Sequence, residues 1–315
     1  MSDHITAVLH TDPACPWGYS EIPALTVIRW RYDAQLDWRL VVIGLTEQAQ
    51  QYIDRGYTPL RQARSSVAFR RYGMPFAPQP KTRVAATARA CRAIVASRLL
   101  EPGSEWRALR ALQLAQFNSP LVMDDDAQLA RVVAAATGHD VDTLLGMLDS
   151  REVTAAYQRD RAEARSAAGS ASELQGKTAN SDGQVRFTAP SVVFERDELT
   201  LVAGGFQPLE AYDVLIANLD PMLERRAVPD DLTQLLAAFP EGLTTQEVAL
   251  LLTRGNDRPD RAAAEMAMLE LVAGHAAARI SLGDSAVWAA PDQIGWMRDV
   301  LASAPGPQRL EVSAA

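Results

Sequence analysis

The chain has 315 residues, of which 48% are hydrophobic and 22% charged, a balance typical of a globular protein with a real core rather than of a disordered chain. Its formal net charge of -8 disfavours binding to a phosphate backbone, so we expect no nucleic-acid partner. Two cysteines cannot form a disulfide framework. The sequence shows neither a signal-peptide pattern nor an apolar run long enough for a membrane, and it therefore predicts a cytoplasmic protein with reduced thiols.

The first 45 residues predict a strand, a helix and a second strand. Ile5–His10 is β-prone and ends at the breakers Thr11-Asp12-Pro13. Pro16 begins a helical pattern that runs to about Tyr32, because proline suits the first turn of a helix. The apolar run Leu36–Leu45 predicts a second, mostly buried strand.

A helical block follows over residues 46–183. Apolar residues recur with helical spacing in Val84–Leu100, Trp106–Phe117, Ala127–Ala136, Leu144–Leu148 and Val153–Ala168. Residues 169–183 are polar and rich in small side chains, which indicates a surface segment.

Strand signals return in Ser191–Phe194 and Leu199–Val202 and predict a hairpin, after which Pro208 begins a helix to about Leu219. Residues 1–45 and 184–220 therefore form one α/β unit, and residues 46–183 are a large all-helical insertion in it.

Residues 221–291 predict a second, smaller module. Its three helical patterns and a hairpin around Gly283-Asp284 follow the order of a winged helix, and Thr244–Glu247 has the form of a capping box. Residues 225–315 hold 8 Arg and 12 Asp plus Glu, a net of -4, which favours packing or homodimerisation over DNA binding. Residues 292–315 are predicted to be a tail.

The segment from Asp12 to Tyr19 carries the candidate chemistry. Cys15 stands between the first strand and the first helix, where unpaired amides and the helix dipole favour a thiolate. Pro16 fixes the entry of the helix, and Trp17 is placed to cover one side of the thiol. The alternative is that Cys15 is a small buried hydrophobic residue.

Pro190 stands at the entry of the later hairpin, where a proline can be cis. A cis Ala189–Pro190 bond would turn the backbone of Ala189 toward Cys15 and let it pair with a bound thiol or peptide. An ordinary trans proline at a strand start is the alternative.

Together, Cys15-Pro16-Trp17 after Asp12-Pro13, the helical insertion and Thr188-Ala189-Pro190 resemble the DsbA-like thioredoxin-fold superfamily over residues 4–220. The FrnE-type oxidoreductases and the 2-hydroxychromene-2-carboxylate isomerases are the most similar branches. The resemblance implies a thioredoxin fold, Cys15 as the nucleophile and Pro190 as the cis-proline. Met74-Pro75-Phe76 is similar to a family segment that overhangs the active site, which implies that Met74 and Phe76 contact substrate.

The sequence departs from the FrnE-type pattern Cys-Pro-Trp-Cys, because Gly18 stands at the fourth position. A second thiol at this position would resolve the mixed disulfide from within, so release requires an external thiol or Cys91. Cys91 lies in a helical pattern, and a buried free cysteine is the usual state of such a residue.

In the 2-hydroxychromene-2-carboxylate isomerases and the similar kappa-class transferases, a bound thiol cofactor attacks the substrate. A Ser-Asp pair at the start of the last helix of those proteins holds glutathione. Here Gly204-Gly205-Phe206 occupies this position. Its amides suit a carboxylate at a helix start, and Thr188 lies near the same site. Glutathione or mycothiol is then the expected co-substrate, with no tightly bound cofactor.

Three functions follow. The first is a monothiol oxidoreductase that forms mixed disulfides at Cys15 with a small thiol or a protein disulfide. The second is a glutathione- or mycothiol-dependent isomerase or transferase that acts on an aromatic small molecule. The third is a non-catalytic binding protein. His10, at the end of the first strand, is a candidate proton donor or thiolate partner, and no histidine or cysteine spacing predicts a metal site.

Overall fold

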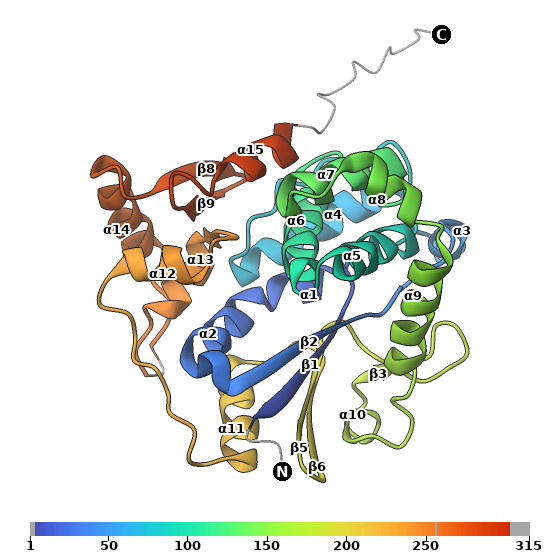
Figure 1. The fold of residues 1–315 in the computed structure, drawn as a ribbon, viewed down its shortest axis with the longest axis horizontal. Coiled ribbons are helices and arrows are strands. Elements are labelled where there is room, and N and C mark those ends of the chain that lie inside the picture. Colours follow the sequence, from blue (N-terminus) through green and yellow to red (C-terminus); the bar gives the residue numbers. More distant parts are fainter. Residues whose placement is uncertain (1–3, 256, 303–315) are drawn as a thin grey trace, which may run out of the picture.

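The computed structural model describes residues 4–255 and 257–302. A four-stranded sheet lies at its centre, in the order β2-β1-β5-β6 (Figure 1). β1 (Ile5–Thr11) pairs in parallel with β2 (Leu36–Val42) and antiparallel with β5 (Ser191–Arg196). β5 pairs antiparallel with β6 (Leu199–Gly204), as expected of the predicted hairpin. The sheet thus joins the two ends of the predicted α/β unit.

Helices cover both faces of this sheet. α2 (Ile22–Tyr32) and α11 (Leu209–Leu219) lie side by side on one face, and α9 (Arg151–Ala164) and α10 (Ala171–Leu174) lie on the other (Figure 1). Successive residues of β1 alternate between these layers, because strand side chains have a period of two. Leu9 joins the larger core cluster and Val8 joins the smaller one, which also contains Cys15.

The predicted helix from Pro16 to Tyr32 is two helices. α1 (Pro16–Ser20) ends at Glu21, and α2 begins at Ile22 with Pro23 in its first turn. Pro23 has no amide hydrogen to continue the ladder from α1, so the chain restarts there. Cys15 therefore precedes a helix of little more than one turn.

The insertion between β2 and β5 consists mainly of helices, and α5, α6 and α7 form its packed centre. Its remaining elements surround that centre. The bounds are α3 (Gln50–Ile53), α4 (Pro59–Phe69), α5 (Ala88–Leu100), α6 (Ser104–Asn118), α7 (Asp126–Thr137), α8 (Val141–Met147), β3 (Thr178–Ala179) and β4 (Arg186–Phe187), with a 3-10 turn at Arg70–Tyr72. A further 3-10 turn, Asp33–Gln35, precedes β2 outside the insertion. The segment 169–183, predicted to be a surface segment, contains α10 and β3, and its Asp182 is paired with Arg165.

The C-terminal module has the predicted order of three helices and a hairpin, with one further short strand. Its elements are α12 (Leu232–Ala238), β7 (Leu243–Thr244), α13 (Thr245–Leu251), α14 (Arg261–Ala273), β8 (Ala278–Leu282) and β9 (Ser285–Ala289), and its sheet has the order β7-β9-β8. The capping box is present, with Thr244 and Glu247 bonding each other's backbone amides. Asn256, in the predicted turn before α14, lies outside the described residues. The winged-helix interpretation stays a prediction.

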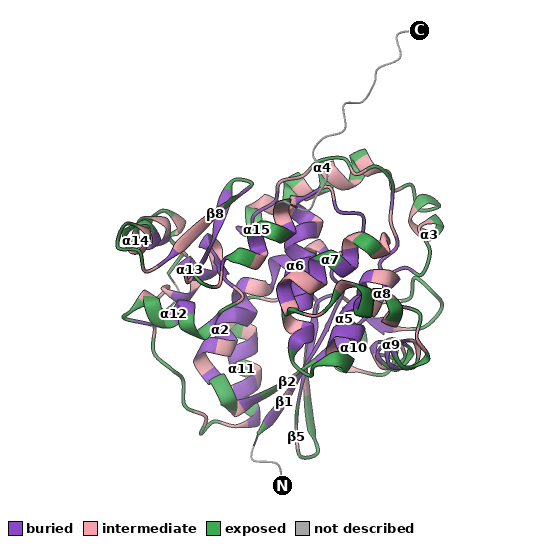
Figure 2. Ribbon diagram, turned by 45° about the horizontal axis from the view of Figure 1, so that its top comes forward, coloured by how far each residue is buried: buried purple, intermediate pink, exposed green. Residues whose placement is uncertain are grey.

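The module is packed against the rest of the chain. α13 contacts α2, and the buried Arg110 of α6 forms an ion pair of 2.7 Å with Glu247 of α13. Figure 2 shows buried residues along α2, α6 and the central strands, whereas α12 and α14 carry more exposed residues. The larger core and the module therefore meet along α2 and α6.

The predicted tail begins later than residue 292. Gly295–Ala302 forms α15, which packs on α6 and α7 with Met297 and Val300 buried. The segment is short, so its apolar spacing is a weak signal without the surface that it covers. Residues 303–315 of the predicted tail lie outside the described residues.

Candidate active site

The turn between β1 and α1 holds Cys15 in a fixed place. The amide of Cys15 donates to the Asp12 carbonyl at 3.0 Å, and the amide of Ala14 donates to Asp12 Oδ1 at 3.0 Å. Cys15 is the N-cap residue of α1, and Pro16 occupies the first turn, where no amide hydrogen is needed. The local sequence thus positions the thiol at the end of the strand.

The Ala189–Pro190 peptide bond is cis, as the resemblance implied. Cys15 Sγ donates to the carbonyl oxygen of Ala189 at 3.1 Å, across 174 positions of the chain. Ser191 Oγ donates to the Thr188 carbonyl at 2.8 Å and fixes the turn that carries this peptide. The backbone of Ala189 and the thiol of Cys15 therefore form one site.

The Cys15 thiol is neutral at rest, which corrects the expectation of a thiolate. Burial raises its pKa to about 11, against the lowering effects of the Gly18 and Trp17 amides and of Arg186. The negative charge of Asp12 raises the pKa further. Only 7% of the residue is exposed, and α1 is too short for its amides to outweigh this desolvation. The proton of the thiol is instead donated to Ala189.

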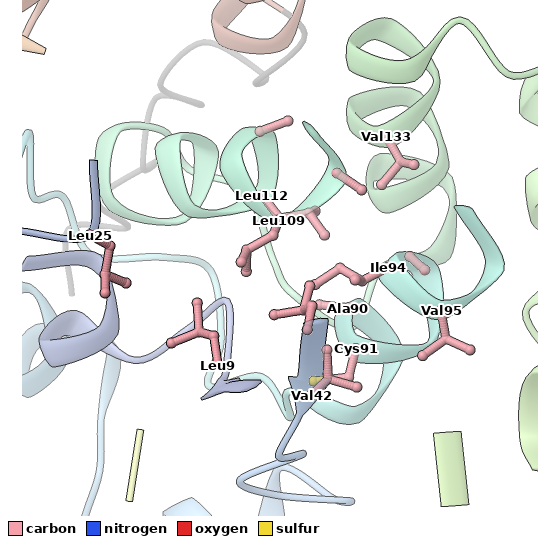
Figure 3. Close-up of a cluster of buried hydrophobic side chains, with 14 of the residues drawn as sticks. Leu9, Leu25, Val42, Ala90, Cys91, Ile94, Val95, Leu109, Leu112 and Val133 are labelled. Carbon is pink, nitrogen blue, oxygen red and sulfur yellow. The ribbon is translucent and has the colours of Figure 1, made fainter. Parts of the chain in front are cut away.

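Cys91 is a buried core residue. Its thiol donates to Asp12 Oδ2 at 3.6 Å, and Figure 3 shows the side chain beside Val42 among apolar residues. Burial raises its pKa well above the usual value. Asp12 is itself buried and accepts further hydrogen bonds from Thr87 Oγ1 and the Leu45 amide. Cys91 thus belongs to the packing around Asp12, and it does not line the cavity described next.

A cavity of about 400 Å³ opens over Cys15. One wall comes from α1, and the other comes from α3, α4 and the loop between them. Aromatic and cationic side chains dominate the lining, among them Trp17, Tyr52, Tyr57, Phe69, Arg55 and Arg186. This volume lies within the usual range of small-molecule sites.

Trp17 forms the exposed rim of the site. Its side chain is 38% exposed, and its ring centroid lies 4.8 Å from Phe69, 5.2 Å from Tyr72 and 5.3 Å from Phe206. Two predicted site residues, Trp17 and Phe206, are thereby brought together with two residues of the insertion. Such ring pairs are individually worth about 1 kcal/mol.

Gly18 leaves no room for a second thiol. A Cβ on Gly18 would lie 2.6 Å from Thr11 Oγ1, closer than real contacts of this kind. A cysteine in α1 at this position therefore requires the Thr11 hydroxyl to move. The packing of β1 against α1 thus agrees with glycine, rather than cysteine, at position 18.

Two of the amides that precede α11 are bonded within the protein, so they do not support the predicted anion site. The Gly205 amide donates to Ser191 Oγ at 3.2 Å, and the Gln207 amide donates to Glu21 Oε2 at 3.0 Å. A Cβ on Gly204 would meet Ser172 Oγ at 2.6 Å, so this glycine is required by the packing of α10. Thr188 Oγ1 donates to the Lys177 carbonyl at 3.0 Å. The Gly205 amide and the Thr188 hydroxyl, two of the donors predicted for a thiol cofactor, are thus bonded within the protein.

Met74 and Phe76 do not reach the cavity, so the prediction that they contact substrate is not supported by their positions. Both are buried; Thr244 Oγ1 of the C-terminal module donates to Met74 Sδ at 3.4 Å. The Phe76 ring packs on Tyr19 and Phe117, at 5.2 and 5.1 Å. The C-terminal module covers this segment, which a resemblance limited to residues 4–220 does not include.

His10 lies beneath the site and is neutral. Burial lowers its pKa to about 4, although Nε2 is only 4.0 Å from Glu163 Oε1. Its ring packs on Phe187 at 4.5 Å and does not line the cavity. The position of His10 and its lowered pKa do not support the prediction of a proton donor to the thiol, because desolvation outweighs the nearby carboxylate. Within residues 4–255 and 257–302, no group of three His, Cys, Asp or Glu residues is placed to hold a metal. No helix in the same ranges is long and apolar enough to cross a membrane.

The residues that sequence analysis missed come from α3, α4 and β4. Tyr52, Arg55 and Tyr57 lie in the part of the predicted helical block before Val84, for which no individual helix was given, and Arg186 precedes the cis-proline turn. One local signal was available, because Thr58 caps α4 and Pro59 follows in its first turn. No pattern in the neighbouring residues predicts that Tyr52, Arg55, Tyr57 and Arg186 lie together around Cys15.

A family model described as a DSBA-like thioredoxin domain matches residues 7–168. A solved structure assigned as a protein disulfide isomerase from Nitrosomonas europaea is similar, with 19% identity and a TM-score of 0.52, over 68% of this chain and 97% of that one. A structure assigned as a DsbA oxidoreductase from Streptomyces coelicolor has 14% identity and a TM-score of 0.52, over 72% and 94%. The cytosolic disulfide reductase DsbM from Pseudomonas aeruginosa has 18% identity and a TM-score of 0.47, over 68% and 98%. No curated protein matches the chain. At these identities the likeness concerns the fold.

Proposed function

Because the chain belongs to the family of DSBA-like thioredoxin domains and is an enzyme of the thiol–disulfide oxidoreductase kind, we propose that it is a monothiol oxidoreductase acting on low-molecular-weight disulfides. One observation carries the proposal: Cys15 Sγ lies on the Ala189 carbonyl of the cis-proline turn, at the base of a cavity of about 400 Å³. Thr11 Oγ1 occupies the space beside Gly18 that a second thiol would need.

The reaction takes place in two balanced exchanges. The Cys15 thiol loses its proton to solvent, and the thiolate attacks one sulfur of a disulfide. The Cys15–sulfur bond forms as the disulfide bond breaks, and the departing thiolate takes up a proton. The thiolate of an external thiol then attacks the substrate sulfur of the mixed disulfide. A new disulfide forms between these two sulfurs, the bond to Cys15 breaks, and the Cys15 thiolate takes up a proton.

The neutral resting thiol sets the pH dependence of the first exchange. With a pKa of about 11, the thiolate is roughly one part in ten thousand at pH 7. The rate of attack on an uncharged disulfide then rises about tenfold per pH unit between pH 7 and 10. The same state protects Cys15 from indiscriminate oxidation while the cavity is empty.

The isomerase or transferase function is the second candidate, favoured by the aromatic walls of the cavity. Trp17, Tyr52, Tyr57 and Phe69 offer ring surfaces to an aromatic substrate. This function requires a bound thiol cofactor, and the amides of Gly205 and Gln207 that would hold it are already paired. We therefore place it behind the oxidoreductase.

The test is reduction of bis(2-hydroxyethyl) disulfide, with glutathione or mycothiol as external thiol. We expect turnover by the wild type, unchanged turnover by Cys91→Ser, and loss of about a hundredfold or more in Cys15→Ser. Mass spectrometry should find the mixed disulfide on Cys15 alone. Equal loss in both variants would make Cys91 a participant in the exchange, whereas no wild-type turnover and no adduct at Cys15 would favour the non-catalytic binding protein.

Three further expectations belong to this proposal. The external thiol is glutathione or mycothiol, and the reaction takes place in a reducing compartment such as the cytoplasm, where both cysteines remain thiols. A homodimer formed through the C-terminal module stays a prediction, which the mass of the protein in solution would test.

A further inference from the structure

Arg186 is a buried cation beside Cys15 that forms no ion pair among the described residues, although the charges of Asp182 and Asp12 act on it from a distance. Only 7% of the residue is exposed. Its Nη1 donates to the Phe187 carbonyl at 3.0 Å and its Nη2 to Ser181 Oγ at 3.3 Å, while its buried Nε has no hydrogen-bond partner among the described residues. Nor does the described part of the chain supply a carboxylate that forms an ion pair with it. A buried charge in this state is unfavourable unless a ligand completes it.

The nearby acidic side chain in the sequence does not serve as that partner. Asp182 Oδ2 accepts from Arg165 Nε at 2.7 Å and from Arg161 Nη2 at 3.2 Å. Its charge is therefore already shared between two other guanidinium groups. Burial lowers the pKa of Arg186, as expected of a cation whose solvation is not replaced.

Arg186 and Cys15 line the same cavity, and each influences the other's ionisation. Arg55 also lines the cavity, and its Nη2 donates to the Ser181 carbonyl at 3.0 Å. The two arginines thus converge on Ser181, which also lines the cavity. A guanidinium presents its donors in a planar fork that matches a carboxylate.

We propose that Arg186, with Arg55 at the rim, binds a carboxylate of the substrate, so that the disulfide exchanged at Cys15 is a small one that carries a carboxylate. This inference rests on the proposed function and names its substrate class. The aromatic residues Trp17, Tyr52 and Tyr57 pack on the body of the substrate. Before α11, the Gly205 and Gln207 amides are bonded to Ser191 and Glu21 and are not available to the same carboxylate.

The exchange itself is unchanged and balanced. The thiolate of Cys15 attacks the sulfur of the bound carboxylate-bearing disulfide, a bond from Cys15 to that sulfur forms, and the other half leaves as a thiolate that takes up a proton. The carboxylate stays on Arg186 throughout and is not consumed. Arg186 is thus a binding residue that orients the disulfide over the thiol.

The test compares two aromatic disulfides that undergo the same reaction. One, 5,5′-dithiobis(2-nitrobenzoate), carries carboxylates, and the other, 4,4′-dithiodipyridine, is neutral. Reaction rates are measured by stopped-flow absorbance on the full chain, with Cys91→Ser as background so that only Cys15 reports. The variants are Arg186→Gln and Arg186→Lys. Arg64→Gln, an exposed position on α4 outside the cavity, is the control of equal charge change.

Loss of the Arg186 charge raises the pKa of Cys15 and slows both reactions alike. We therefore expect Arg186→Gln to lose about tenfold or more in rate with the carboxylate reagent beyond its loss with the neutral one, the worth of a charge-assisted hydrogen bond. Arg186→Lys should keep part of the preference, and Arg64→Gln should change neither rate. Circular dichroism checks that each variant is folded. If Arg186→Gln does not fold, the rates of Arg186→Lys with the two reagents decide whether Arg186 binds the carboxylate.

Two results would overturn the inference while leaving the proposed function in place. Equal losses with both reagents would mean that Arg186 acts only on the ionisation of Cys15, and unchanged rates would mean that it binds no substrate group. If Cys15 in the wild-type protein reacts with neither reagent, the proposed function itself fails.

Discussion

Two regions of the molecule each bury an arginine, and they do so in opposite ways. Arg110, between α6 and the C-terminal module, is 5% exposed and bonds Glu247 Oε2 at 2.7 Å and the Gly242 carbonyl at 3.0 Å. Arg186, at the Cys15 cavity, is 7% exposed and forms no ion pair among the described residues. The same side chain at the same burial is a structural contact where the protein supplies the countercharge, and a candidate binding group where it does not.

The region around Arg110 contains only a small cavity, of about 60 Å³, and the countercharge lies within it. Glu247 also accepts a hydrogen bond of 2.9 Å from Thr26 Oγ1, so α2, α6 and α13 meet at one carboxylate. The region around Arg186 faces a cavity of about 400 Å³. The difference teaches that burial alone does not identify a functional residue, and that the missing partner does.

The largest expected effect is at Glu247. Glu247→Gln leaves Arg110 buried without a countercharge, and we expect a loss of about 3–5 kcal/mol in the free energy of unfolding. Glu265→Gln is the matched control, because Glu265 pairs with Arg279 on the surface of the same module and should cost less than about 1 kcal/mol. Denaturation in urea measures both. Similar losses in the two variants would contradict the distinction between the regions.

His10 extends the comparison to a buried base that stays neutral. Its pKa is lowered to about 4 in the fold, chiefly by burial, from an ordinary value of 6.5. The folded state therefore disfavours the charged form, and the contribution of His10 is fully present above pH 6.5 and is lost as the pH falls through about 4. At about 1.4 kcal/mol per unit, this loss amounts to about 3 kcal/mol.

His10→Phe keeps a ring against Phe187 and removes the titration. We expect the free energy of unfolding of the wild type to fall by about 3 kcal/mol more than that of the variant between pH 7 and pH 4. Denaturation midpoints across this range supply the measurement. Parallel curves for the two proteins would show that His10 is not held neutral.

A medium effect is expected at Gly18, where α1 packs against β1. Gly18→Cys places a Cβ against Thr11 Oγ1, and we expect a loss of about 1–3 kcal/mol from overpacking. Thr11→Ala combined with Gly18→Cys should recover most of that loss, and thermal unfolding compares both with Thr11→Ala alone. A stable Gly18→Cys single variant would mean that packing does not exclude the second thiol.

The smallest effect is expected for the stability of Arg186→Gln. Removal of an unpaired buried charge offsets the loss of two hydrogen bonds, so the free energy of unfolding should change by less than about 1 kcal/mol. The measurement is the same urea titration as for Glu247→Gln. A loss as large as that of Glu247→Gln would make Arg186 a structural residue like Arg110.

Local rules were enough for several parts of the fold. The break at Thr11-Asp12-Pro13, the proline after Cys15 and the capping box at Thr244–Glu247 each depend on neighbouring residues, and each predicted its element. The contact between Cys15 and Ala189 spans 174 positions, so only the resemblance to a family predicted it, and no rule based on neighbouring residues could. α15 was missed because its apolar face has meaning only against α6 and α7.

The amino-acid sequence by itself determined the strand and helix that position Cys15, the proline turn that follows at Pro190, and the absence of a second thiol at Gly18. The tertiary structure decided the ionisation of Cys15 and His10, the occupation of the amides before α11, and the pairing of Arg110 but not of Arg186. The physical reason is that hydrogen bonds within a turn depend on adjacent residues, whereas desolvation and countercharge depend on every segment that packs around a group.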